Sequence, residues 1–93
     1  MPRTLFQKAV VLTPDDPLVR ATTGRVYVAQ KKYELAVPHL EEAVRLRPDY
    51  APARFTLAQA YRELGRKEDA ARESREFQRL RAAENAAAGP SAK

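Results

Sequence analysis

Apolar and small side chains recur along this chain at the three- and four-residue spacing of helices. One set follows a first helix: Val19, Thr23, Val26, Tyr27 and Gln30. A second set follows another: Tyr33, Ala36, Val37, Leu40, Ala43, Val44 and Leu46. The short polar stretch AQKKY separates the two sets, so the pattern predicts a helical hairpin.

The same arrangement appears a second time further along the chain. The stretch LTPDDPLVR begins at Leu12, and LRPDYAPAR begins 34 positions later at Leu46. At this offset the matched pairs are Pro14 with Pro48, Asp15 with Asp49, Arg20 with Arg54, Thr22 with Thr56, Tyr27 with Tyr61, Ala36 with Ala70 and Leu46 with Leu80. Self-similarity at such a period is typical of stacked helical repeats.

Capping residues predict where the first helix of each hairpin begins. Asp15 and Asp16 precede Pro17, so a carboxylate can accept the first free N–H groups while the proline takes an early helical position. Asp49, before the stretch YAP, is expected to repeat this cap.

The turns within the two hairpins differ in a way that affects their stability. Gly65 in ELGRK suits the left-handed residue that ends a helix, whereas Lys31 at the equivalent position does not. Pro38 lies about one turn into a second helix and removes a hydrogen bond only if that helix begins before Glu34.

With these features the chain resembles the tetratricopeptide repeat (TPR) family. The residues that meet the family pattern are Gly24, Tyr27, Ala36, Leu40, Ala43 and Pro48, then Leu57, Ala58, Tyr61, Gly65 and Ala70, with Phe6, Ala9, Leu12 and Pro14 before them. The resemblance implies an all-α fold, a right-handed superhelical stack of antiparallel helix hairpins (a TPR-like α-solenoid), with about five helices. Small residues are expected where helices approach closely.

Several positions depart from the family pattern. Arg20 and Arg54 stand at its aromatic position, Thr23 at its leucine, and Ser74, Phe77 and Ala82 at its large apolar residue, alanine and proline in the last helix. The last three fall where no further repeat is expected to pack, so the pattern can relax there.

The repeat divides the chain into four parts. Residues 1–14 are expected to form the second helix of a partial N-terminal TPR, 17–50 and 51–84 two TPR units, the latter with an extended last helix, and 85–93 a disordered tail. Because arrays usually need three or more repeats, we expect the chain to be the C-terminal part of a longer TPR protein. The alternative is a naturally short protein that covers its first helix by self-association.

The resemblance implies that the first helices line a concave groove that holds a peptide or helix of a partner. The groove positions are Leu18, Ala21, Thr22, Arg25, Val28, Ala29, Pro52, Phe55, Thr56, Gln59, Arg62 and Glu63. Among these, Leu18, Val28 and Phe55 could accept apolar anchors. Arg25 and Arg62 could pair with carboxylates, and Gln59 could bond a peptide backbone. We therefore expect an acidic and apolar protein partner, while the Lys and Asn pattern that clamps a chaperone carboxylate is missing.

Net charge adds a weaker hypothesis. The chain carries a formal charge of +5, which would attract nucleic acid. Against this, Tyr27, Tyr33 and Tyr61 fall on repeat-core positions, where they cannot stack on bases. A third hypothesis is an assembly or scaffold element that self-associates through its end helices, for example through Phe6, Val10, Phe77 and Leu80.

The remaining chemistry of the sequence is sparse. There is no cysteine, and His39 is the only histidine, so neither a metal site of the usual kind nor a thiol nucleophile can form. We expect no cofactor and no enzymatic activity. No apolar run approaches the roughly 20 residues of a membrane span, and no secretion signal is visible. The sequence does not identify a compartment, and the cytoplasm is the default expectation.

Overall fold

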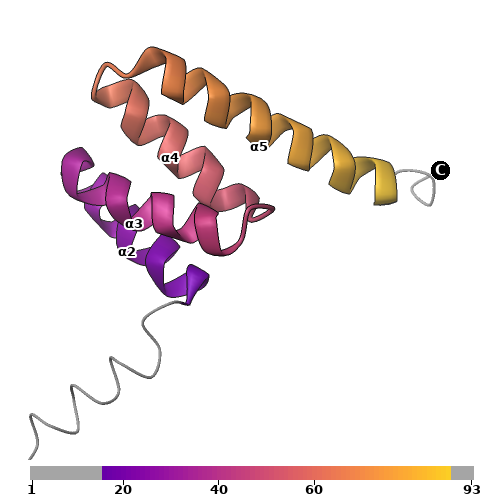
Figure 1. Cartoon of the computed structure of the whole chain (residues 1–93), viewed down its shortest axis with the longest axis horizontal. Coiled ribbons are helices and arrows are strands. Elements are labelled where there is room, and N and C mark those ends of the chain that lie inside the picture. The colour runs from indigo at the N-terminus through magenta and orange to yellow at the C-terminus, as the bar shows by residue number, and fades with distance from the viewer. Residues whose placement is uncertain (1–15, 89–93) are drawn as a thin grey trace, which may run out of the picture.

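Two helical hairpins follow one another along the chain. The computed structural model describes residues 16–88, which form the helices α2 (Pro17–Ala29), α3 (Tyr33–Leu46), α4 (Ala51–Glu63) and α5 (Lys67–Ala88). Helices α2 and α3 form one antiparallel pair and α4 and α5 the other, and α4 packs against α3 and also touches α2 (Figure 1). The all-α fold of sequential hairpins is therefore confirmed. The fifth helix, expected within residues 1–14, lies outside the described residues, and the right-handed superhelix stays a prediction.

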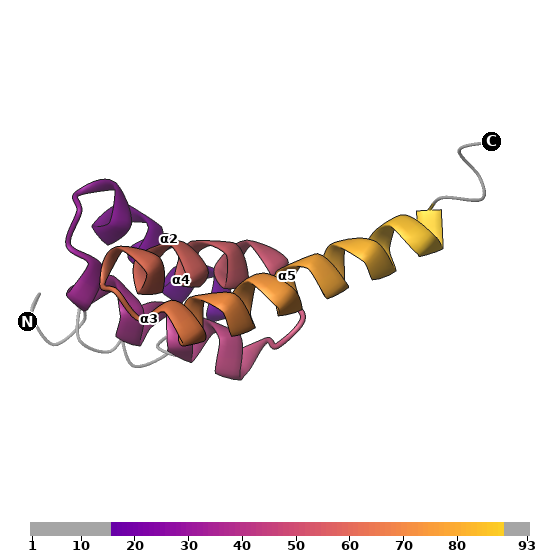
Figure 2. The same ribbon diagram turned by 90° about the horizontal axis from the view of Figure 1, so that it is seen from above.

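Helix α5 is much longer than its counterpart in the first hairpin. It has 22 residues, against 14 in α3. Its last turns extend past the beginning of α4 with no other described helix beside them (Figure 2). The sequence-based boundary near Asn85 is too early, because the helix continues to Ala88 through a run of alanine, the strongest helix former. The tail expected from residue 85 therefore begins as helix, and residues 89–93 lie outside the described part.

Capping at the two first helices is not equivalent. Asp16 is the N-cap of α2, where its Oδ1 accepts a hydrogen bond from the Leu18 amide at 2.9 Å, and Pro17 follows as predicted. The cap predicted at Asp49 is wrong. The residue before α4 is Tyr50, whose side chain makes no capping bond, and Asp49 lies one residue too early to reach the first amides. Its carboxylate instead approaches Arg47 Nε at 3.6 Å.

The two turns inside the hairpins have the same backbone geometry. Lys31 has a φ of +63° and Gly65 a φ of +81°, so both adopt the left-handed conformation. In each turn the amide of the next residue reaches back to a tyrosine carbonyl at 2.8 Å, Lys32 to Tyr27 and Arg66 to Tyr61. These bonds satisfy the last carbonyls of α2 and α4. Lys31 thus bears the strain that glycine avoids.

Small residues allow the helices to approach closely. A Cβ atom added to Gly24 would lie 2.4 Å from Leu40 Cγ, so this position on α2 has no room for a side chain. Five small residues that meet the family pattern are buried, as expected where helices approach closely: Gly24, Ala36, Ala43, Ala58 and Ala70. The main core joins both hairpins and contains Ala36, Val37, Leu40, Leu57, Ala60, Tyr61 and Ala70.

One face of α2 differs from the pattern-based expectation. Val19 and Val26, predicted to face the core, are about half exposed, at 49% and 50%. Their equivalents on α4, 34 positions later, are Ala53 and Ala60, and both are completely buried. Helix α4 has the preceding helix α3 packed against it, whereas no described helix covers the corresponding face of α2.

Polar pairs replace the family's aromatic position in both hairpins. Arg54 Nη1 donates to Glu73 Oε1 at 2.8 Å, and both side chains are largely buried, at 14% and 5% exposure. The equivalent pair in the first hairpin joins Arg20 Nη1 to His39 Nδ1 at 3.2 Å. An arginine always donates, so His39 accepts this bond at Nδ1. The pair with Glu73 explains how Arg54 is tolerated at an inward-facing site.

A further polar contact connects the two hairpins. The Tyr61 hydroxyl on α4 donates to Glu41 Oε2 on α3. Burial raises the pKa of Tyr61 well above its ordinary value, and the bond to Glu41 raises it further. The hydroxyl therefore stays protonated in the folded chain.

Helix α3 contains one defect that the sequence indicated. It begins at Tyr33, before Glu34, and Pro38 lies inside it. The proline has no N–H to donate to the Glu34 carbonyl, so one helical hydrogen bond is missing from the first turns. Pro38 is exposed. The strongly buried face of α3 around Leu40 compensates for this loss.

The turn geometry predicts a stabilising substitution. Lys31→Gly should raise the free energy of unfolding by up to about 1 kcal/mol, because relief of the left-handed conformation outweighs the entropy that glycine loses on folding. Urea unfolding followed by circular dichroism measures the change. The reciprocal control Gly65→Lys should lower stability by a similar amount. A destabilised Lys31→Gly would contradict this account of the turn.

The buried ion pair predicts a larger effect. Glu73→Gln should lower the free energy of unfolding by roughly 3 kcal/mol, because Arg54 keeps its charge in a buried site. The double replacement Arg54→Met with Glu73→Leu should recover most of this loss, since it removes both charges. As a control, Glu76→Gln breaks the exposed contact with Arg79 and should change stability little. A Glu73→Gln protein as stable as the parent would show that the pair is not important.

Candidate binding groove

A shallow hollow lies between the first helices of the two hairpins. Its volume is about 400 Å³. Helix α2 contributes Arg25, Val28 and Ala29, and α4 contributes Pro52, Phe55, Thr56 and Gln59. All seven residues belong to the groove positions expected from the sequence. The order of the helices brings them together because α4 lies beside α2 as well as α3.

The six residues chosen as a binding site occupy this region to different degrees. Arg25, Val28, Phe55 and Gln59 line the hollow. Leu18 and Arg62 are exposed on the same two helices but are not among the lining residues. The structure thus brings four of the six side chains together. Their role in binding stays a prediction.

One groove assignment is wrong, and another needs adjustment. Ala21 is only 2% exposed because it packs with Ala43 of α3 and Ala53 of α4, so it belongs to the core. Thr56 borders the hollow but is mostly buried. Its hydroxyl donates to the Pro52 carbonyl of its own helix at 3.0 Å, so one of its bonding capacities is already used.

An aromatic contact at the edge of the hollow was not assigned to the groove from the sequence. The ring of Phe55 lies against that of Phe77 on α5, with centroids 5.2 Å apart and planes inclined by 48°. The Arg81 guanidinium carbon lies 5.6 Å from the centroid of the Phe77 ring. The sequence offered one indication of this contact, which is that Phe77 stands where the family pattern has alanine.

The two arginines of the groove helices differ from most others in their electrostatic surroundings. Within residues 16–88, neither Arg25 nor Arg62 takes part in an ion pair. On α5, by contrast, Asp69 binds two arginines and Arg79 pairs with Glu76. Hydrogen bonds from arginine hold the pKa values of Asp69 and Glu76 below their usual range. Helices α2 and α4 therefore present two guanidinium groups that no carboxylate within residues 16–88 neutralises, and one of them, Arg25, lines the hollow.

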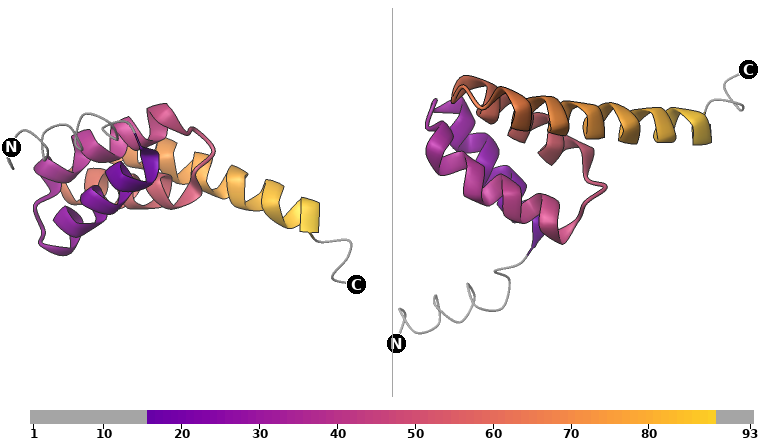
Figure 3. Two further views of the ribbon diagram at one scale, coloured as in Figure 1. Left: turned by 90° about the horizontal axis from the view of Figure 1, so that it is seen from below. Right: turned by 45° about the horizontal axis from the view of Figure 1, so that its top comes forward.

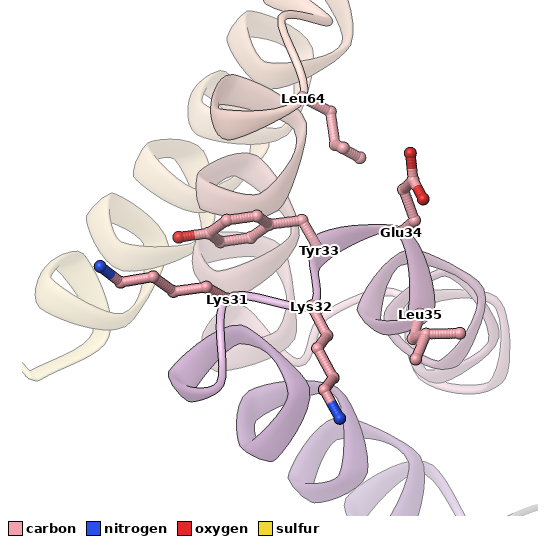
Figure 4. Close-up of a pocket in the computed structure, with 6 residues that line it drawn as sticks. All are labelled: Lys31, Lys32, Tyr33, Glu34, Leu35 and Leu64. Carbon is pink, nitrogen blue, oxygen red and sulfur yellow. The ribbon is translucent and has the colours of Figure 1, made fainter.

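A second hollow, of about 460 Å³, lies at the turn between α2 and α3. It is lined by Lys31, Lys32, Tyr33, Glu34, Leu35 and Leu64. In Figure 4 the charged ends of Lys31, Lys32 and Glu34 point in different directions. A ligand site needs polar groups that converge. We therefore favour the hollow between α2 and α4.

Other kinds of site find no support in the part of the chain that the structure describes. Residues 16–88 contain no group of three or more acidic, histidine or cysteine side chains placed to hold a metal ion. Within the same range, none of the helices has the length and apolar character needed to span a bilayer.

The fold and the hollow define a helical-repeat protein with one grooved face. Comparison with known sequences agrees with this class: the signature described as tetratricopeptide repeat matches residues 27–76. The TPR repeat-containing thioredoxin TTL4 of Arabidopsis thaliana is 38% identical over 68 residues, which are 73% of this chain and 10% of that protein. The chain belongs to the tetratricopeptide repeat family. It spans about a tenth of the length of this relative.

Proposed function

We propose that this chain is a protein-interaction module that binds a peptide or helix of a partner in the groove between α2 and α4. TPR domains are in general protein-interaction modules, and the match to the family gives this chain the same broad role. The observation that supports the specific site is the hollow itself, in which seven residues from two first helices meet. Extended peptides commonly bind in such grooves through alternating apolar and polar contacts.

The lining of the groove supports a partner that carries both carboxylates and apolar side chains. Arg25, which lines the hollow, and Arg62, which lies on α4 outside the lining, can each form charge-assisted, bidentate bonds with Asp or Glu of the partner. Val28 and the exposed ring of Phe55 offer apolar contact. Gln59 can donate to and accept from a peptide backbone. We further propose that the module works within a longer TPR protein, has no cofactor and is not an enzyme.

Self-association is the second candidate function. The observation that favours it is the half-exposed face of α2 around Val19 and Val26, whose equivalents on α4 are covered by another helix. Light scattering over a concentration series tests it, and a strict monomer would argue against it.

Nucleic-acid binding has less support. Tyr61 is buried, and Tyr27 and Tyr33 pack against the core, so these rings cannot stack freely on bases. Binding to a random oligonucleotide with a steep salt dependence would revive this candidate.

Charge reversal in the groove tests the proposal. Peptides that bind the chain are first selected from a displayed random library. Arg25→Glu with Arg62→Glu should then weaken their binding by about tenfold or more, because attractive contacts with carboxylates become repulsive. Circular dichroism should show unchanged helix content.

A matched control separates the groove from net charge. Lys32→Glu with Arg75→Glu changes the total charge equally at exposed positions outside the hollow. It should leave peptide affinity nearly unchanged. If both double variants lose the same affinity, net charge alone explains the effect. If the Arg25→Glu and Arg62→Glu variant keeps its affinity, the groove assignment is wrong.

A further inference from the structure

Comparing the two hairpins at the 34-residue offset shows an exchange of small for large residues. In the first hairpin Ala21 of α2 and Ala43 of α3 form a buried cluster with Ala53 of α4. The methyl groups of these three alanines fill the space between the helices because the beginning of α4 lies close to the first hairpin. The equivalent positions in the second hairpin hold Phe55 and Phe77. Their rings contact each other across α4 and α5.

The rings fill the place that a next helix would need. A helix seated on the second hairpin as α4 is seated on the first would overlap the Phe55 and Phe77 rings. Neighbouring positions have changed too. The apolar residues Val37, Leu40 and Val44 of α3 correspond to the small or polar residues Ala71, Ser74 and Gln78 of α5. This face of the second hairpin is therefore poorly suited to receive a further stacked hairpin.

The aromatic pair instead continues the groove. Phe55 lines the hollow together with Arg25, and it remains 55% exposed even though it touches Phe77. Phe77 comes from α5, so the apolar wall extends from a first helix onto a second helix. Helices α4 and α5 pack side by side, as the right-hand view of Figure 3 shows. A large exposed ring held by another ring is costly in water and well prepared for contact with a partner.

The charges around the pair indicate its occupant. Arg25, which lines the hollow with Phe55, makes no ion pair within residues 16–88, and Arg81 lies over Phe77 with an exposed contact to Glu84 at 3.8 Å. Cationic groups beside an aromatic patch complement a partner with acidic residues around an apolar anchor. A second copy of the chain is a poorer match, because each copy carries a net charge of +5.

We propose that Phe55 and Phe77 form an anchor platform, which receives an aromatic or leucine side chain of an acidic partner peptide. This inference rests on the proposed function and specifies which partner residue determines binding. Binding energy at such sites concentrates on a few aromatic anchors that become fully desolvated. Phe77 acts as part of the recognition surface, and Phe77 also fixes the orientation of the Phe55 ring.

The test uses an array of short synthetic peptides. Each peptide has a glutamate-rich background and a single central position that is varied. The chain should prefer Trp, Phe or Leu over Ala at the centre by about tenfold. Phe77→Ala should abolish this preference, and Phe77→Leu should retain part of it. Leu35→Ala removes an exposed apolar side chain from α3, outside the hollow between α2 and α4, and should leave the preference intact.

A second measurement guards against variants that do not fold. Because the chain has no tryptophan, tryptophan emission reports the peptide alone. Because it has three phenylalanines, their ring signals are few in NMR spectra. Addition of the Trp peptide to the unaltered chain should shift the ring signals of Phe55 and Phe77.

The outcomes separate the two proposals. Suppose that the peptides bind and that Arg25→Glu with Arg62→Glu weakens their binding. If the chain then shows no preference at the central position, or if a folded Phe77→Ala variant keeps the preference, the platform is overturned and the groove remains. Unshifted ring signals on binding would overturn it as well. No binding to any acidic peptide would overturn both proposals. A dimer that Phe77→Ala dissociates would assign the platform to a second copy and overturn the peptide as occupant.

Discussion

The close approach of α4 to the first hairpin, through side chains no larger than a methyl group, is the contact on which the structure depends. Ala43 and Ala53 are completely buried where the hairpins meet, and Ala21 lies with them. A helix hairpin cannot bury its own apolar face, so each one relies on its neighbour. The Tyr61 hydroxyl adds a directional bond to Glu41 across the same interface. The hollow between α2 and α4 exists because this contact places two first helices side by side.

The two repeats reach one geometry with different side chains. Lys31 and Gly65 adopt the same left-handed turn, although only glycine does so without strain. Gly24 and Leu40 of the first hairpin correspond to Ala58 and Ser74 of the second. The glycine leaves room for the large leucine, whereas the larger alanine is matched by the smaller serine. Such compensations maintain the fold. The exchange of Ala21 and Ala43 for Phe55 and Phe77 is different, because it exposes a large ring and changes what the surface can bind.

The sequence predicted the helices and the hairpins because periodicity and a 34-residue offset determine which residues share a face. The groove positions implied by the resemblance to the TPR family include all seven residues of the hollow. Prediction from the sequence failed where a neighbour decides burial: Ala21 and Val26 have positions on a helix that periodicity can assign, but only packing shows that one is covered and the other exposed. The Asp49 cap failed by one residue, which lies within the usual uncertainty of helix ends. The contact of Phe77 with Phe55 depends on two side-chain conformations from different helices, and no sequence pattern records these.

The most direct test of the account is an NMR measurement on a sample with labelled alanine methyl groups. Nuclear Overhauser contacts from the Ala53 methyl to those of Ala21 and Ala43 report the stacking of one hairpin on the other. The account predicts these contacts together with the contact between Ala21 and Ala43 inside the first hairpin. If the contact inside the hairpin is present and those to Ala53 are missing, the hairpins do not stack as described, and the groove between α2 and α4 does not exist.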